Sequence, residues 1–201
     1  ITLDEEFKSI NADVEEVIVD NKINLNFTIE ESEKYIVEKI NIFGNNVTRE
    51  NVIRNQLEVD EGDFYNEILK NKSENNLKSL NFFKTVKSET LDGNTPNSKI
   101  INIFIEEKAT GEIFAGAGAG SDGATITAGI KENNYLGKGI RVEANATLTE
   151  ESFKGKFSIV NPNFNNSDKS LFGDIQALEI DQLKNYGYKT NKVGFAIGTG
   201  F

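Results

Sequence analysis

The side chains of this chain that could do chemistry are carboxylates, lysines, tyrosines and hydroxyls, because its 201 residues include no His, Cys, Met or Trp. Their absence excludes thiolate nucleophiles, disulfides, the Ser-His-Asp triad and the usual zinc sites. Two adjacent carboxylate pairs, Glu106-Glu107 and Glu150-Glu151, lie in strand-like stretches, where neighbouring side chains point to opposite faces. Neither pair can act as an acid–base dyad. We therefore expect a protein that is not an enzyme and has no catalytic residue, cofactor or metal site.

A glycine-flanked lysine, Gly137-Lys138-Gly139, is the one short motif with a likeness to a phosphate-binding loop. The spacing of a P-loop and its following Ser or Thr are absent, so a hairpin turn is predicted instead. The net charge of -10 argues against nucleic acid as a partner, because phosphate binding needs clustered Lys and Arg and the sequence has no such cluster.

The composition changes near residue 110. Only Gly44, Gly62 and Gly93 precede residue 111, and the other 14 of the 17 glycines follow it. Two compositions predict two modules. No stretch of the sequence approaches the roughly 18 consecutive apolar residues that a transmembrane helix needs. A β-barrel is not excluded by this criterion, because only about half of the residues in its strands are apolar.

The first module begins with a predicted hairpin, formed by strands over residues 10–19 and 22–29 with a turn at Asp20-Asn21. Such a hairpin has too little apolar surface to stand alone, so we expect it to close a domain that begins earlier. Residues 34–108 then read strand, helix, helix, strand, strand. Thr48 and Asp63 are the predicted N-caps of the two helices. This order predicts an α+β module in which one sheet is covered by two helices.

From residue 111 onward apolar and polar residues alternate with a period of two, with short polar or glycine-bearing links between the runs. The pattern predicts an up-and-down antiparallel meander. One interpretation is a soluble β-sandwich with its apolar face inward. The other is a membrane barrel, in which the apolar row touches lipid and the polar row lines the lumen. The predicted lumen-facing residues are Lys131, Arg141, Glu143, Lys154 and Lys156.

Several runs in order resemble a known family. They are YIVEKINIFGN at 35–45, LNFFKTV at 80–86, a strand ending in EEK at 106–108, the glycine-alternating stretch that follows Thr110, NNYLGKG at 133–139 and NPNF at 161–164. Each run is weak alone, but together and in collinear order they resemble the last POTRA domain and the first barrel strands of BamA-type outer-membrane assembly proteins.

The resemblance implies a fold class, an α+β POTRA domain of order β-α-α-β-β followed by antiparallel up-and-down transmembrane β-barrel strands. It implies the C-terminal hairpin of a preceding POTRA domain over residues 1–32, the final POTRA domain over 33–109, and about six N-terminal barrel strands over 110–201. The expected location is the outer membrane, with the POTRA domains in the periplasm.

The function implied by the resemblance is the assembly and insertion of β-barrel proteins into the outer membrane without ATP. The implied partners are unfolded outer-membrane proteins, accessory assembly lipoproteins and the lipid bilayer. Two alternatives stay open: a related barrel that translocates proteins, and a soluble periplasmic binding module with a β-sandwich.

One predicted device is an unpaired edge of the POTRA sheet, which would bind an extended chain by β-augmentation. The candidate strands are residues 82–88 and 99–107, and the alternative is that a neighbouring POTRA domain covers either edge. The predicted partner-binding residues are Phe82, Phe83, Val86, Ile101 and Ile103.

The second predicted device is the strand over residues 111–120. Strands gain packing from bulky, β-branched side chains, whereas this one offers mainly Gly and Ala, so we expect it to pair weakly. In the family this strand meets the last one at a seam that can open toward the membrane, and a weak seam suits a lateral gate. The alternative is that the glycines only allow close approach or bending of the barrel. The predicted gate residues are Gly111, Ile113, Phe114, Gly116, Gly118 and Gly120.

Overall fold

The computed structural model describes residues 10–19, 22–31, 34–120, 123–167 and 169–200. The predicted turn at Asp20-Asn21 lies outside these residues. The chain forms two compact units, which are described separately. The first contains Ile1–Gly44 and Gln56–Glu106, and the second contains Asn45–Asn55 and Glu107–Phe201. A short segment between β3 and α2 of the first unit therefore belongs with the second.

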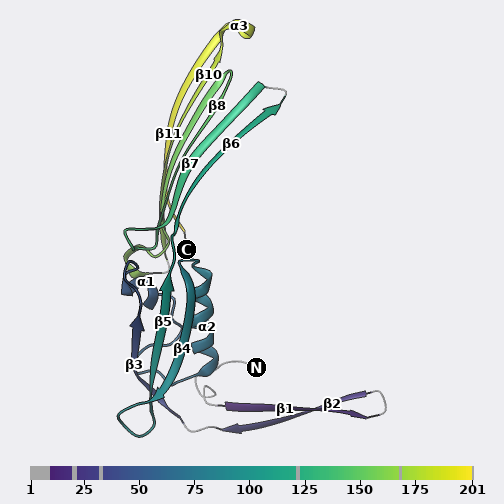
Figure 1. The fold of residues 1–201 in the computed structure, drawn as a ribbon, viewed down its shortest axis with the longest axis vertical. Helices are drawn as coiled ribbons and strands as arrows, with labels where there is room; N and C mark the ends of the chain where they lie inside the picture. Colours follow the sequence, from purple (N-terminus) through teal and green to yellow (C-terminus); the bar gives the residue numbers. More distant parts are fainter. Residues whose placement is uncertain (1–9, 20–21, 32–33, 121–122, 168, 201) are drawn as a thin grey trace. The chain divides into compact units, whose positions relative to one another are not determined.

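The first unit is built on a three-stranded sheet of β3 (Ile36–Phe43), β4 (Phe83–Asp92) and β5 (Ser98–Glu107). The strand order is β3-β5-β4, and β3 and β5 run parallel. Helix α2 (Glu67–Ser79) lies along this sheet (Figure 1). Its Leu77 is completely buried. The other buried hydrophobic residues of the unit are Val37, Ile40, Val59, Phe82, Phe83, Val86, Ile101, Ile103 and Ile105.

Both predicted helix caps are wrong. Helix α1 (Glu50–Arg54) has Arg49 at its N-cap position, without a side-chain cap. Thr48 instead turns its hydroxyl to the amide of Asn134. Helix α2 is capped by Asn66, whose Oδ1 accepts from the backbone N–H groups of Ile68 and Leu69 at 2.8 and 3.2 Å. The predicted cap Asp63 accepts from the backbone N–H of Asp60, so it closes the preceding turn rather than the helix.

Replacing Asn66 by alanine is expected to destabilise the first unit by about 1 kcal/mol, because two N–H groups of the first helical turn lose their acceptor. The midpoint of urea unfolding measures the loss. The matched control is Asn75→Ala on the exposed surface of α2, which should leave the midpoint unchanged or raise it slightly, since alanine has the higher helix propensity. Equal midpoints for the two variants would contradict the capping role.

The hairpin of β1 (Ile10–Val19) and β2 (Lys22–Glu31) is a two-stranded antiparallel sheet. Val14 lies opposite Phe27, and Ile18 opposite Ile23. Because opposite residues share a face, these four side chains lie on one face together with Leu25 and Glu16, and all four are exposed.

The second unit is dominated by a six-stranded sheet (Figure 1). Its strands follow one another in the sheet as they do in the chain, and every neighbouring pair is antiparallel. The up-and-down meander predicted from the alternation is therefore confirmed, as an open sheet. The strands are β6 (Gly111–Gly120), β7 (Gly123–Tyr135), β8 (Ile140–Thr149), β9 (Ser152–Asn161), β10 (Ser170–Gln182) and β11 (Tyr188–Gly200).

Short links join these strands. A 3-10 turn, η2 (Phe164–Asn166), lies between β9 and β10, and one helical turn, α3 (Leu183–Tyr186), lies between β10 and β11. No helix among the described residues is long and apolar enough to cross a membrane.

Candidate functional site

Strand β6 is an open edge of the six-stranded sheet. It lies at the end of the strand order and, among the described residues, pairs with β7 alone, from Gly111 opposite Glu132 to Gly120 opposite Gly123. All ten of its residues are exposed. A Cβ atom added at Gly116 or Gly118 would meet nothing within 4 Å. The strand predicted to pair weakly therefore lies at an edge and has little side-chain packing of its own.

The two large side chains of β6 lie on opposite faces of the sheet. The ring of Phe114 covers Gly129 of β7, because a Cβ built on that glycine would lie 2.4 Å from the Phe114 Cζ atom. Ile113 is opposite Ile130 and is 88% exposed.

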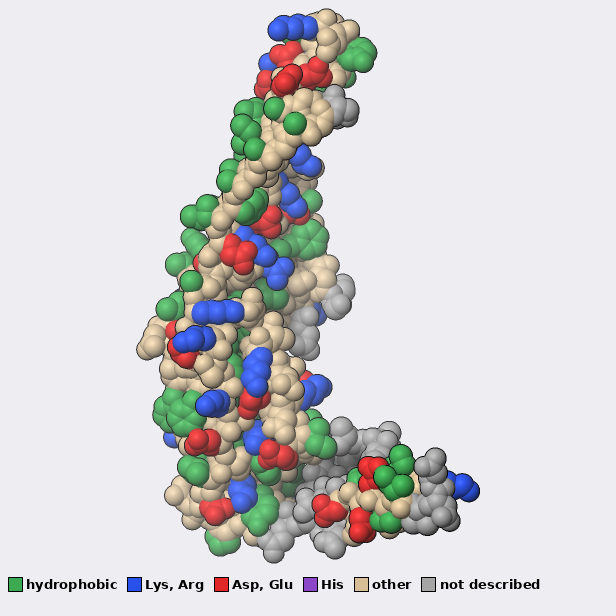
Figure 2. Space-filling model, turned by 45° about the vertical axis from the view of Figure 1, so that its right-hand side comes forward, with side chains coloured by type: hydrophobic (Ala, Val, Ile, Leu, Met, Phe, Trp, Pro, Cys, Tyr) green, Lys and Arg blue, Asp and Glu red, His purple; other side chains and the backbone are tan. Residues whose placement is uncertain are grey.

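The face that carries Ile113 is apolar across the sheet. The register aligns one residue of each strand in a row across it, and neighbouring rows continue mainly with Ala, Val, Ile, Leu and Phe, with Glu132 and Glu179 toward the two ends of the strands. The space-filling view shows exposed hydrophobic side chains along this sheet (Figure 2). A soluble sandwich would bury such a face, whereas lipid would solvate it. The row contains Ile113, Ile130, Ala144, Phe157, Ile175 and Phe195.

The opposite face is polar and brings together the five residues predicted to line a lumen. Lys131 is opposite Glu143, Lys154 opposite Thr147, and Lys156 opposite Asn145; Arg141 lies two positions along β8 from Glu143 on the same face. Lys156 also approaches Asp174 of β10, with Nζ 3.7 Å from Oδ1. The shared face is an observation, and its assignment to a barrel lumen stays a prediction.

Of the two strands predicted as possible open edges of the three-stranded sheet, one lies at an edge and the other does not. Strand β5 is central, between β3 and β4, so the prediction that residues 99–107 form an open edge is wrong. Because β3 pairs with β5 in parallel, β5 lies between β3, which precedes the helices in the sequence, and β4, which follows them. Strand β4, which contains most of residues 82–88, is an edge strand of this sheet.

The five side chains predicted to bind partners at this edge are core residues. Phe82, Phe83, Val86, Ile101 and Ile103 are each buried. Their apolar side chains serve packing in the core of the first unit. What β4 exposes is its backbone and polar side chains such as Lys87 and Glu89.

The other edge of this sheet is closed by the segment that follows α1. The N–H of Val37 donates to the carbonyl of Asp63 at 2.8 Å, and its carbonyl accepts from Gly62 at 2.7 Å. Further along β3, the N–H of Ile40 donates to the Glu61 carboxylate at 2.9 Å. In the sequence, the acidic stretch 61–63 indicated the end of the first helix and an N-cap for the second at Asp63. Its hydrogen bonds to β3 depend on a contact between segments that no local pattern reveals.

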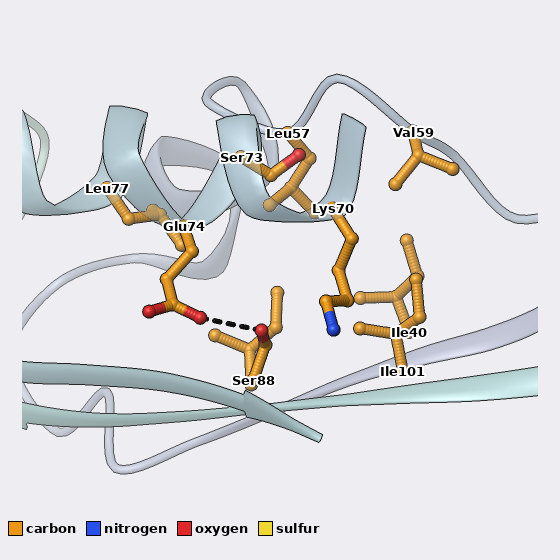
Figure 3. A pocket seen from close by; sticks show the side chains of 10 residues that line it. Ile40, Leu57, Val59, Lys70, Ser73, Glu74, Leu77, Ser88 and Ile101 are labelled. Carbon is orange, nitrogen blue, oxygen red and sulfur yellow. Dashed lines mark hydrogen bonds between the residues drawn. The ribbon is translucent and has the colours of Figure 1, made fainter. Parts of the chain in front are cut away.

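The close-up in Figure 3 shows a hollow in the first unit that has both apolar and charged residues around it. It lies between α2 and the sheet, with Lys70 close to Ile40 and Ile101 and Glu74 above Ser88, whose hydroxyl donates to Glu74 at 2.7 Å. Its volume of about 10 Å³ holds at most roughly one water molecule. Among the described residues there is also no acidic cluster that could hold a metal ion. The candidate site therefore consists of sheet edges and faces.

Comparison with known proteins assigns these features to a family. The POTRA family model, described as "Surface antigen variable number repeat", matches residues 35–108. The solved structure of BamA from Haemophilus ducreyi lacking POTRA domains 1–3 superposes on 97% of this chain and 38% of that one, with a TM-score of 0.79 and 26% identity. This chain is of the BamA type.

Curated relatives agree with this assignment. The outer membrane protein assembly factor BamA of Neisseria meningitidis serogroup B is 29% identical over 175 residues, covering 84% of this chain and 22% of the relative. BamA of Buchnera aphidicola is 28% identical over 200 residues, covering 90% of this chain and 32% of the relative. The chain thus spans between about a fifth and a third of these relatives' length. The similarity places this BamA-type chain at the outer membrane, with its POTRA domain in the periplasm.

A second group of solved structures shares the fold at lower similarity. CdiB from Acinetobacter baumannii has a TM-score of 0.55 and 13% identity over 95% of this chain and 37% of its own. At this identity the likeness concerns the fold alone.

Proposed function

We propose that this BamA-type chain takes part in the assembly and insertion of β-barrel proteins into the outer membrane. The observation that carries the proposal is the superposition of 97% of the chain on BamA, with a TM-score of 0.79. It spans the POTRA match and the six-stranded sheet together. The activity needs backbone edges and an apolar surface, and it requires none of the catalytic side chains that the composition excludes.

The lateral gate of this proposal is the open edge of β6. An edge strand presents unpaired N–H and C=O groups that can pair with an incoming strand. Because β6 is mostly Gly and Ala, its pairing with another strand gains little from side chains, and such a seam opens at low cost. The apolar rows that begin at Ile113 would face the lipid bilayer, and the row of Lys131 and Glu143 would face the lumen once further strands close the barrel.

The proposed POTRA contribution is β-augmentation at β4. This strand has β5 as its only neighbour in the sheet order, whereas the segment 61–65 occupies the edge of β3. The occupant would be an unfolded outer-membrane protein or an accessory assembly lipoprotein. We further propose that residues 1–32 end a preceding POTRA domain, whose remaining parts would cover the apolar face around Phe27, with the final POTRA domain over 33–109 and barrel strands over 110–201.

The two alternative functions have less support. A soluble binding module with a β-sandwich would need a second sheet over Ile113, Val193 and Phe195, which are each more than three-quarters exposed. A protein-translocating barrel has no support among the curated relatives, since the similarity in sequence is to assembly factors.

The proposal is tested by adding an unfolded β-barrel client to lipid vesicles that contain the full-length protein. Folding of the client is followed by its heat-modifiable electrophoretic mobility. We expect faster folding than in protein-free vesicles, with the client in the membrane. Transfer of a soluble client into the vesicle lumen, with no acceleration of barrel folding, would favour the translocating function instead.

A further inference from the structure

Two motifs that look like independent turns in the sequence lie against each other in the second unit. They are the segment 45–49, which follows β3, and the turn 134–139 between β7 and β8. The backbone N–H of Arg49 donates to the carbonyl of Gly137 at 2.8 Å. The Nδ2 of Asn134 donates to the Thr48 hydroxyl at 2.9 Å, and both side chains are buried. Buried polar groups so far apart in sequence are paired at a contact that excludes water.

The backbone of the turn is shaped for this contact. Gly137 has φ of +69°, which favours glycine, and a Cβ at this position would lie 1.9 Å from the carbonyl oxygen of Val47. The Oδ1 of Asn134 accepts from the N–H of Gly139 at 2.8 Å, so one amide side chain both closes the turn and reaches the segment. A side chain of any size on residue 137 would push the two segments apart.

The other side of the segment is held by Glu107. Its carboxylate accepts three successive backbone N–H groups, from Asn46 and Val47 at 2.9 Å each and from Thr48 at 2.6 Å. Burial disfavours the charge, but the hydrogen bonds from Thr48, Val47 and Asn46 outweigh it and hold the pKa of Glu107 below its ordinary value. The carboxylate is therefore ionised at neutral pH, where its hydrogen bonds are strongest.

Three residues after Glu107 the chain is fixed a second time, immediately before β6. The Thr110 hydroxyl donates to the Glu132 carboxylate. The Thr110 carbonyl accepts from the backbone N–H of Asn133 at 3.3 Å and from its side-chain amide at 3.1 Å. The same Glu132 oxygen accepts from the N–H of Asn134 at 2.7 Å. One continuous network thus runs from the segment 45–49 through the turn to Thr110, the residue before the edge strand.

We propose that Glu107 and Asn134 form a latch that docks the segment 45–49 on the β7–β8 turn and so anchors the base of the edge strand β6. The far part of β6, from Gly116 to Gly120, has no comparable anchor among the described contacts. The strand is therefore fixed by side chains just before its first residue, whereas its glycine-rich end is held by its backbone pairing with β7. Glu107 and Asn134 are positioning residues, and the inference stands whether or not the proposed function is correct.

The test is hydrogen–deuterium exchange at single-residue resolution on the full-length protein in lipid vesicles. Thr48→Val removes the hydroxyl that accepts from Asn134 at nearly constant volume, and Glu107→Gln removes the charge that holds the three N–H groups. In both variants we expect roughly tenfold faster exchange, or more, at the amides of Val47 and Arg49 and at those of residues 111–114 at the base of β6. The reason is that the loss of one buried hydrogen bond weakens protection by about 1.4 kcal/mol or more.

Two matched variants make the result specific. Thr48→Ser keeps the hydroxyl and should keep wild-type protection. Thr127→Val removes a threonine hydroxyl bond elsewhere, to Thr147 at 3.1 Å within the sheet, and should leave the exchange of residues 45–49 unchanged. Unchanged exchange of Arg49 in both latch variants, or loss of protection in Thr48→Ser as large as in Thr48→Val, would overturn the latch. Faster exchange at 45–49 with unaltered exchange at 111–114 would overturn the anchoring of β6.

Discussion

Replacing Gly116 and Gly118 of β6 together by valine is expected to slow the insertion of a β-barrel client roughly tenfold. Valine favours extended backbone, and its branched side chain gains contacts with a strand paired across the seam, as it also does with Thr125 and Thr127 of β7 opposite the two glycines. Each substitution contributes up to about 1 kcal/mol to strand pairing, and about 1.4 kcal/mol corresponds to a factor of ten. The added side chains have room, because a Cβ at either position meets no atom within 4 Å. A strand that pairs more tightly makes a seam that opens less often.

The insertion rate is measured in vesicles with the full-length protein, and Gly155→Val is the matched control. Gly155 lies in β9, inside the sheet, and its added Cβ would make only ordinary contacts with the Phe153 ring, the nearest at 3.5 Å. The control gains similar strand propensity away from the edge and should insert clients at the wild-type rate. A double variant at positions 116 and 118 that matches the wild type would remove the argument for a gate built on weak pairing.

Replacing Ile101 by alanine is expected to destabilise the first unit by about 2–5 kcal/mol, because a buried aliphatic side chain leaves a cavity in a packed core. Ile101 is 1% exposed and lies in the central strand β5. The loss is measured by urea titration of the full-length protein, followed by hydrogen exchange of the β5 amides. This substitution also separates the core role found in the structure from the partner-binding role predicted from the sequence.

The control for Ile101 is Lys87→Ala on the exposed side of the edge strand β4. Surface substitutions of this kind change stability by less than about 0.5 kcal/mol. A Lys87→Ala variant as unstable as Ile101→Ala, or an Ile101→Ala variant with wild-type stability and weakened client binding, would contradict the assignment of Ile101 to the core.

The six-stranded sheet could be predicted from the sequence because a strand's side chains alternate with a period of two. The alternation around Val142 and Ala144 predicts which residues share a face, and consecutive strands with short links pair with their neighbours in order. The same alternation predicts a common face for the polar residues Lys131 and Glu143, and the register of β7 and β8 places them opposite each other.

Strand order in the first unit could not be predicted in the same way. The runs around Val86 and Ile103 both alternate, and nothing local indicates which of them is central. The order follows from the parallel pairing of β3 with β5, a contact between residues about 60 positions apart such as Ile40 and Ile101. An apolar residue type does not distinguish a buried core side chain from an exposed binding side chain. The residues predicted to bind partners are buried in the core.

Local polar chemistry was the least predictable part. Thr48 followed by a helix has the sequence of an N-cap, yet its hydroxyl accepts from Asn134, 86 residues away. Glu107 similarly reads as one of two adjacent strand carboxylates, while its hydrogen bonds go to the segment 46–48. Tertiary hydrogen bonds of this kind outweigh local capping preferences, which contribute only about 1 kcal/mol.

The most direct test of the proposed function is disulfide formation between β6 and a client strand during insertion. Single cysteines at Ala115, Ala117 and Ala119 of the full-length protein meet no native cysteine in this chain. The client carries single cysteines along one edge strand. If the open edge of β6 pairs with that strand in one register, each β6 cysteine forms a disulfide with one client position. Moving the cysteine by two residues along β6 then moves that position by two residues along the client strand. A client that inserts at the normal rate without any disulfide to β6 would contradict the gate.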